Sequence, residues 1–291
     1  MTETSWAGWN PERLAAEIEE TAVPYGMVAV WWLGQGSFVL KGGTSILYID
    51  PFAMGEDELK SRHGLKRSYP PLLEPEHIRH ADYCLITHEH IDHLDPAAIA
   101  AMAKQKRETI YMSPRCCIDV LVELGVPANR ITAADVRKPH VDQNRKLAVQ
   151  PVPAAHEELE PDEHGYHRYV GYVIRFNGVH IYHAGDTLVY GGLPERLKQE
   201  NIDLAFVPIN GRDVFRTDRG IVGNMNYREA AELAHLANFR TTVPMHYDMF
   251  PGNTEHPGYF VDYVYDRYPH LPVAVLARGR RFLYASDEAL R

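Results

Sequence analysis

Thr87-His88-Glu89-His90-Ile91-Asp92-His93-Leu94-Asp95 is the stretch that decides how this chain folds. Three imidazoles and the Asp92 carboxylate lie within the six residues from His88 to His93, and a packed core does not hold so many polar groups unless something pairs with them. One divalent metal ion could pair with several of these groups at once. The alternative is a histidine-rich turn that is solvated by water. The pattern differs from the helical His-Glu-x-x-His metal motif, because His90 directly follows Glu89.

The flanking residues place this stretch on a loop between a strand and a helix. Residues 81–86 form a short apolar run that is typical of a buried strand. Asp95 is a candidate N-cap, and Pro96 is a candidate first residue of a helix over 97–104. The polar side chains between them therefore follow the end of a strand.

Three distant polar residues also follow apolar runs that indicate strands. His156 comes after residues 147–152, Asp186 after 179–183, and His246 after 241–244. Side chains at strand ends on one edge of a sheet converge, so we expect these residues to meet His88. Asp50, at the end of a predicted strand over 45–49, has two interpretations that stay open: a turn cap, or an acceptor that orients a ligand imidazole.

The remaining elements follow from periodicity and turn residues. We expect a short amphipathic helix that begins at Asn10-Pro11, and a hairpin across Asn177-Gly178. Further helices are predicted over 114–124, 226–238 and 259–268. Further strands are predicted over 27–33, 37–40, 109–112, 169–176, 204–208, 273–276 and 282–284.

Two polar segments are predicted to be loops near the site. Residues 52–71 mix charge, Gly and Pro and form the most basic segment, either a solvated surface or a rim that attracts anions. Residues 157–167 are placed like an active-site lid.

Composition narrows the class of protein. The 291 residues carry a net charge of −9 without a dense Lys/Arg stripe, which argues against a polymeric nucleic acid partner. Cys84, Cys116 and Cys117 give no disulfide framework, and the adjacent pair is poorly placed to close on itself. The N-terminus resembles no signal peptide, and no apolar run is long enough to span a bilayer. We therefore expect a cytoplasmic protein with no membrane partner.

The His-x-His-x-Asp-His motif resembles that of the metallo-β-lactamase-fold hydrolases. The resemblance implies an α/β fold, the αββα sandwich of two mixed β-sheets flanked by helices, with the site at the edge where strands end. It implies a single domain over 1–291, with 1–26 as an N-terminal helical extension. It also implies one metal on His88, His90 and His156, a second on Asp92, His93 and His246, and Asp186 as the bridge between them.

Within that superfamily the chain is most similar to the L-ascorbate-6-phosphate lactonase (UlaG-like) group. The similarity rests on Trp31-Trp32-Leu33-Gly34, Tyr182-His183-Ala184-Gly185-Asp186, Arg219-Gly220-Ile221 and His246-Tyr247-Asp248, within residues 29–251. It implies a lactonase that acts on a small phosphorylated sugar-like substrate through a metal-bridging hydroxide.

The expected site follows from that chemistry. Five imidazoles and two carboxylates around two divalent ions lower the pKa of a bridging water. Nitrogen and oxygen ligands suit Zn or Mn, and also Fe or Co. We expect Asp92 and His183 to be catalytic, with His183 either supporting a ligand or simply packed. The candidate substrate contacts are Arg212, Arg219 and Tyr247.

Other functions remain as alternatives. The first is a phosphodiesterase or nuclease that acts on small nucleotides, or another hydrolase of the same fold. A di-iron redox enzyme would more comfortably show a carboxylate in place of His90, and a degenerate binding module would have lost ligands. Trp6 and Trp9 are candidates for a homo-oligomer contact.

Overall fold

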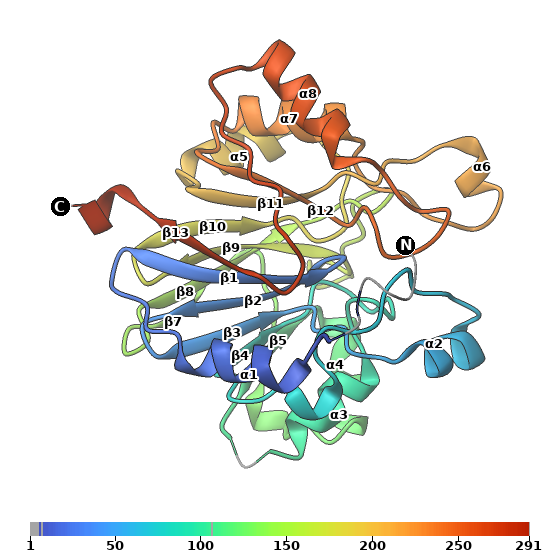
Figure 1. Ribbon diagram of the computed structural model, residues 1–291, viewed down its shortest axis with the longest axis vertical. Coiled ribbons are helices and arrows are strands. Elements are labelled where there is room, and N and C mark those ends of the chain that lie inside the picture. Colours follow the sequence, from blue (N-terminus) through green and yellow to red (C-terminus); the bar gives the residue numbers. More distant parts are fainter. Residues whose placement is uncertain (1–5, 7, 106, 291) are drawn as a thin grey trace.

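Two mixed β-sheets face each other at the centre of the computed structural model, which describes residues 6, 8–105 and 107–290 (Figure 1). The first sheet contains, in spatial order, β13 (Arg281–Ala285), β1 (Met27–Gly34), β2 (Ser37–Gly42), β3 (Ser45–Ile49), β4 (Tyr83–Leu85), β5 (Ile110–Ser113) and β6 (Ile131–Ala133). The second contains β12 (Thr242–Met245), β11 (Leu204–Pro208), β10 (Val179–His183), β9 (Val170–Phe176), β8 (Leu147–Pro153) and β7 (His140–Asp142).

Helices cover the outer face of each sheet. The first sheet is covered by α1 (Pro11–Glu20), α3 (Pro96–Ala103) and α4 (Ile118–Glu123). The second is covered by α5 (Leu193–Gln199), α7 (Tyr227–Leu236) and α8 (Pro257–Arg267). The short helices α2 (Glu56–His63) and α6 (Val214–Thr217) project from one side of the sandwich (Figure 1). This arrangement confirms the predicted αββα sandwich.

Each sheet is antiparallel in one half and parallel in the other. Strands β3 to β6 are parallel in the first sheet, and β10 to β12 are parallel in the second. The chain's first and last long strands are neighbours, since β1 pairs with β13 from Met27 opposite Ala285 to Trp31 opposite Arg281. The ends of the parallel strands therefore gather at one edge of the sandwich.

Strand β1 shows why the apolar runs of this sequence are continuous. Val28, Val30 and Trp32 belong to the core between the sheets, whereas Trp31 and Leu33 belong to the core beneath the helices. Because side chains alternate between the two faces and both faces are covered, every position is apolar.

Two predictions about elements were wrong. The predicted loop over 52–71 contains α2, which buries only Leu59 and so shows no amphipathic period. Its acidic first turn and basic last turn suit the helix dipole. The predicted strand over 273–276 contributes only one bridge, between Val273 and Thr242.

Helix α1 is attached to the body through a buried lysine. Asn10 caps the helix as predicted, and the Lys41 Nζ donates hydrogen bonds to the carbonyls of Ile18 (2.9 Å) and Glu19 at its C-terminal end. Trp9 donates from Nε1 to the Leu72 carbonyl at 2.9 Å. Residues 1–5 and 7 of the predicted extension lie outside the described residues, and the oligomer contact stays a prediction. Among the described helices, none has the length and apolar character needed to cross a bilayer.

Candidate metal centre

The predicted ligands come together at the edge where strands end. His88 follows β4, His156 follows β8, Asp186 follows β10, and His246 follows β12. Backbone hydrogen bonds hold these loops in place: Val170 N–H, at the start of β9, donates to the Thr87 carbonyl at 3.1 Å, and His246 N–H donates to the Gln35 carbonyl in the β1–β2 turn at 3.2 Å. Residues that are far apart in the sequence thus share one rigid rim.

The first group of ligand atoms belongs to His88, His90 and His156, which lie within 4.8 Å of one another. The Nε2 of His88 is 3.0 Å from the Nδ1 of His90. Burial lowers the pKa of His88 well below its usual range, and the neighbouring His93 and His90 lower it further. Burial and His156 also lower the pKa of His90. The lowered pKa favours the neutral form of His88 and His90, which is the form of imidazole that binds metals.

The second group consists of Asp92, His93 and His246, again within 4.8 Å. Asp186 lies between the two groups: its Oδ2 is 3.3 Å from the Nε2 of His246 and 3.7 Å from the Nε2 of His156. Its Oδ1 is 3.4 Å from the Nε2 of His93. This carboxylate therefore reaches both groups.

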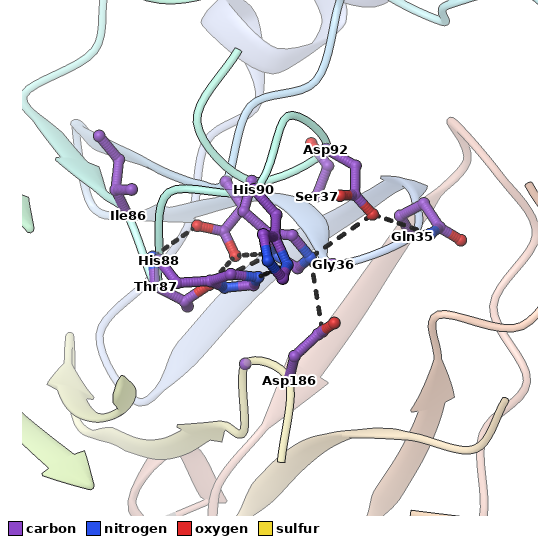
Figure 2. A network of polar contacts seen from close by, with 12 residues as sticks. Gln35, Gly36, Ser37, Ile86, Thr87, His88, His90, Asp92 and Asp186 are labelled. Atoms are coloured by element: carbon purple, nitrogen blue, oxygen red, sulfur yellow. Dashed lines mark hydrogen bonds and ion pairs between the residues drawn. The ribbon is translucent and has the colours of Figure 1, made fainter. Parts of the chain in front are cut away.

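A layer of hydrogen bonds behind the cluster fixes the ring of His93. Figure 2 shows the side chains of His88, His90, Asp92 and Asp186 extending from separate parts of the backbone toward this cluster. Asp50 accepts from the His93 Nδ1 (2.7 Å), from the Thr87 Oγ1 (2.7 Å) and from the Thr87 N–H (2.8 Å). Both Asp50 and His93 are fully buried. The contacts match the second of the two interpretations of Asp50, an acceptor that orients an imidazole so that its Nε2 faces the centre.

The charges of the metal-free cluster are strongly coupled. Burial alone would lower the pKa of His93, but the carboxylates of Asp186, Asp92 and Asp50 outweigh it and raise the pKa to about 10. Burial alone would raise the pKa of Asp92, but His93 and His246 hold it well below its usual range. Without a metal, one proton on His93 therefore takes the place of a cation among the carboxylates.

Buried polar atoms that lack partners provide a test of whether a metal fits. Among the described residues, the His93 Nε2 and the Asp186 Oδ1 are buried and accept or donate no hydrogen bond. Both atoms face the centre, since they lie 3.4 Å from each other. Orphaned buried polar atoms are costly, and a divalent cation bound by nitrogen and oxygen would satisfy both.

Two glycines make room for the cluster. A Cβ on Gly36 would lie 2.9 Å from the Cε1 of His93, and a Cβ on Gly185 would lie 2.7 Å from the Val170 carbonyl oxygen. Gly185 also has a φ of +62°, which side chains disfavour. The turn between β1 and β2, which packs against His93, and the turn before Asp186 therefore require glycine.

His183 does not present a free ring nitrogen to the cluster. Its Nε2 donates to the Gly36 carbonyl at 2.8 Å, and its Nδ1 accepts from the Gly185 N–H at 3.2 Å. The ring is fully buried, edge-on to Phe38. These contacts are those of a positioning residue beside the turn that carries Asp186, and the catalytic role of His183 stays a prediction.

The predicted substrate contacts fall in different surroundings. The exposed Arg212 donates to both carboxylate oxygens of Glu229, at 2.6 and 2.7 Å. Arg219 is exposed after α6. Tyr247 is buried, packs on Trp32 with ring centroids 5.2 Å apart, and lines a cavity of about 730 Å³. The structure does not bring these three side chains together.

Sequence reasoning missed several residues around the cluster. The ring of Tyr169 lies 5.3 Å from that of His88 and 5.2 Å from that of His156, and Gln35 donates from Nε2 to the Asp92 Oδ2 at 3.1 Å. Tyr169 sits at the start of a predicted strand and Gln35 in a predicted turn. Their place beside a predicted loop or turn was the one signal in the sequence that could have identified Tyr169 and Gln35.

The predicted lid over 157–167 lies beside Glu89. Arg168 donates to Glu89 (2.5 Å) and to Glu160 (3.0 Å), and Asp162 pairs with Arg115 at 3.5 Å. These contacts attach the segment to the loop that carries His88 and His90. Its role as a lid stays a prediction.

Comparison with known proteins adds a family context to this geometry. Residues 47–247 match the model of the beta-lactamase superfamily domain. The chain is 26% identical over 276 residues to a protein of Escherichia fergusonii described as a probable L-ascorbate-6-phosphate lactonase, UlaG, with 84% of this chain and 75% of that protein covered.

Solved structures share the fold. Igni18, a metallo hydrolase from the archaeon Ignicoccus hospitalis, superposes with a TM-score of 0.65 at 21% identity, over 89% of this chain and 98% of that chain. CmlA, a diiron β-hydroxylase from Streptomyces venezuelae, superposes with a TM-score of 0.63 at 14% identity, over 91% of this chain and 55% of that chain. Since the two carry different chemistry, this likeness shows the fold alone.

Proposed function

Because this chain belongs to the beta-lactamase superfamily and is a hydrolase of the metallo-β-lactamase fold, we propose that it opens the lactone ring of a small phosphorylated sugar-like substrate with two divalent metal ions. The observation that carries the metal chemistry is the convergence of three-residue ligand groups around buried atoms that lack partners. The substrate class rests on the similarity to UlaG, which extends over 84% of the chain.

The proposed ligands divide into two sites. His88, His90 and His156 would hold one ion, and Asp92, His93 and His246 would hold the other. Asp186, which lies within 3.3 to 3.7 Å of the ring nitrogens of His246, His93 and His156, would contact both. When bound, such ions act as Lewis acids and lower the pKa of water, so that hydroxide forms near neutral pH.

The protein's own residues orient the ligands and handle protons. Asp50 holds the His93 ring through Nδ1, and Gln35 holds Asp92 through Oδ2. The side chain of Asp92 is 14% exposed and that of Asp186 is 5% exposed. We therefore assign to Asp92 the transfer of the proton that the attacking water loses. Water adds across the acyl carbon–oxygen bond, which leaves a carboxylate, a hydroxyl group and one released proton.

The deciding experiment is hydrolysis of L-ascorbate 6-phosphate by protein loaded separately with Zn and with Mn, with bound metal counted on the same samples. UlaG from Escherichia fergusonii serves as the positive control, and His90→Ala as the matched inactive variant. Turnover with about two metals bound would support the lactonase.

Two other outcomes would change the proposal. Two bound metals without turnover would overturn the proposed substrate class but not the proposal of a metal-dependent hydrolase. Cyclic nucleotides and other small phosphodiesters would then be assayed. Full turnover by His90→Ala would overturn the site itself.

A further inference from the structure

A second cluster of ligand atoms lies on the outer side of the loop that carries His88 and His90. Glu89, Cys116 and Cys117 each offer one donor atom, and these atoms lie within 4.8 Å of one another. Cys116 and Cys117 lie in the turn just before α4 (Ile118–Glu123). We propose that these three residues form a site for one thiophilic divalent cation of the zinc or cadmium type, distinct from the metal centre.

The distances between the donor atoms suit a common ion. The two sulfur atoms are 4.0 Å apart, so metal–sulfur bonds of about 2.3 Å would meet at an angle of about 120°. The Sγ of Cys116 is 3.9 Å from the Oε2 of Glu89, which with a metal–oxygen bond of about 2.1 Å gives an angle of about 125°. Both ligand–metal–ligand angles are close to the angles around a three-coordinate ion or in a flattened tetrahedral site.

A disulfide fits this pair less well than a shared ion. A disulfide needs its sulfur atoms about 2.05 Å apart, roughly half of the 4.0 Å observed. Joining adjacent residues would also require the backbone of the turn to move. The distance between the two sulfur atoms is instead the one expected when both bind the same metal ion.

A bound divalent ion would offset most of the negative charge that the three donor groups bring together. Two thiolates and the Glu89 carboxylate bring three negative charges, and a divalent ion supplies two positive ones. Arg168 donates to the other oxygen of Glu89, Oε1, at 2.5 Å and also to Glu160 at 3.0 Å, so its positive charge is shared between the two carboxylates. The Oε2 that faces Cys116 is therefore left to bind the ion.

The cluster is accessible from outside. Cys116 is exposed and lines a cavity of about 280 Å³, together with Arg115, His167 and Arg168. Cys117 is buried beneath it. An ion can therefore enter from the cavity and keep a fourth position toward it, and a bound ion would join the loop of the metal centre to the turn before α4.

The test is a titration of the full chain with Cd²⁺ alone, followed by thiolate-to-cadmium charge-transfer absorption in the ultraviolet. The metal centre has no sulfur, so Cd²⁺ bound there contributes nothing to this band. We expect a band that saturates at about one equivalent of thiolate-bound Cd²⁺. In Cys116→Ser the affinity should fall at least about ten-fold, and Glu89→Gln should weaken binding without removing the band.

Cys84→Ala is the matched control, since Cys84 is the remaining cysteine and lies buried in β4. It should leave the band unchanged. The exposed position of Cys116 keeps Cys116→Ser foldable, which circular dichroism verifies. The proposal is overturned if the wild-type protein shows no thiolate band, if Cys116→Ser binds Cd²⁺ like the wild type, or if the band disappears in Cys84→Ala.

Discussion

The metal centre and the α6 segment (212–222) lie on the same rim of the sandwich but obey different constraints. In the metal centre, His88, His93, Asp186 and His246 are nearly fully buried, and the ring of His93 is fixed from behind by Asp50. In the α6 segment, Phe215 remains 72% exposed. Burial forces a polar side chain to have a partner, whereas exposure leaves it free. Chemistry could therefore be inferred for the first region and much less for the second.

The strongest test of this comparison is removal of the metal. A chelator should abolish turnover, and added Zn or Mn should restore it, because the buried cluster then regains its cation. The metal-free protein should also become sensitive to alkaline pH. The pKa of His93 is raised from 6.5 to about 10, so its stabilising contribution is complete below about pH 6.5 and is lost as the pH rises toward 10.

Thermal unfolding at pH 7 and pH 10, with and without chelator, measures this effect. The metal-loaded protein should lack the His93 contribution, since its Nε2 then carries no proton. Equal alkaline sensitivity of both forms would contradict the assignment of His93 as a ligand.

The next largest effect is expected for His90→Ala. Loss of one ligand should reduce turnover by at least about a thousand-fold and lower the metal content, because the first site keeps only His88 and His156. The fold should persist, since His90 is only partly buried. His164→Ala, at an exposed histidine of the 157–167 segment, is the control and should match the wild type.

Asp50→Asn tests the layer behind the ligands. The amide cannot accept from both the His93 ring and Thr87 as the carboxylate does, so we expect a loss of about 10- to 100-fold in metal affinity or activity. Metal titration and turnover measure it. Asp57→Asn, at an exposed position of α2, is the matched control. If Asp50→Asn bound metal with the affinity of the wild type, the orientation of the His93 ring would not depend on Asp50.

Arg219→Ala tests the exposed region. If Arg219 pairs with a substrate phosphate, KM should rise about ten-fold with kcat unchanged, and the rise should shrink at high salt. Arg228→Ala on α7 removes an equal charge from another exposed position and should change neither constant. Unchanged KM for Arg219→Ala would remove it from the substrate contacts.

The smallest effect is expected for Arg212→Ala. Because Arg212 donates to Glu229 at a half-exposed pair, the substitution should cost at most about 1 kcal/mol of stability. Denaturant unfolding measures this cost, and KM should stay unchanged. A rise in KM like that of Arg219→Ala would instead restore the substrate contact predicted from the sequence.

Much of the fold and of the candidate cluster could be predicted because the end of an apolar run in the sequence marks the end of a strand. Apolar runs that end in His156, Asp186 and His246 indicated residues that the structure brings together. Helix α2 was missed because it buries a single leucine, Leu59, and so leaves no apolar period.

Contacts between side chains of different loops could not be predicted. The bidentate pair of Arg212 with Glu229 depends on how the chain before α6 folds back onto α7. The position of Tyr169 against His88 likewise depends on where β9 begins relative to β4. Neither relation has a local pattern in the sequence.

The pairing of β1 with β13 affects how this protein folds while the ribosome is still synthesising it. Roughly 250 residues separate the end of β1 from the start of β13. At about 5–20 residues per second, the edge of β1 waits on the order of 10 to 50 s for its partner. During that time its backbone groups can pair with another nascent chain. Chaperone dependence during translation is therefore expected to be greatest before the last strand emerges.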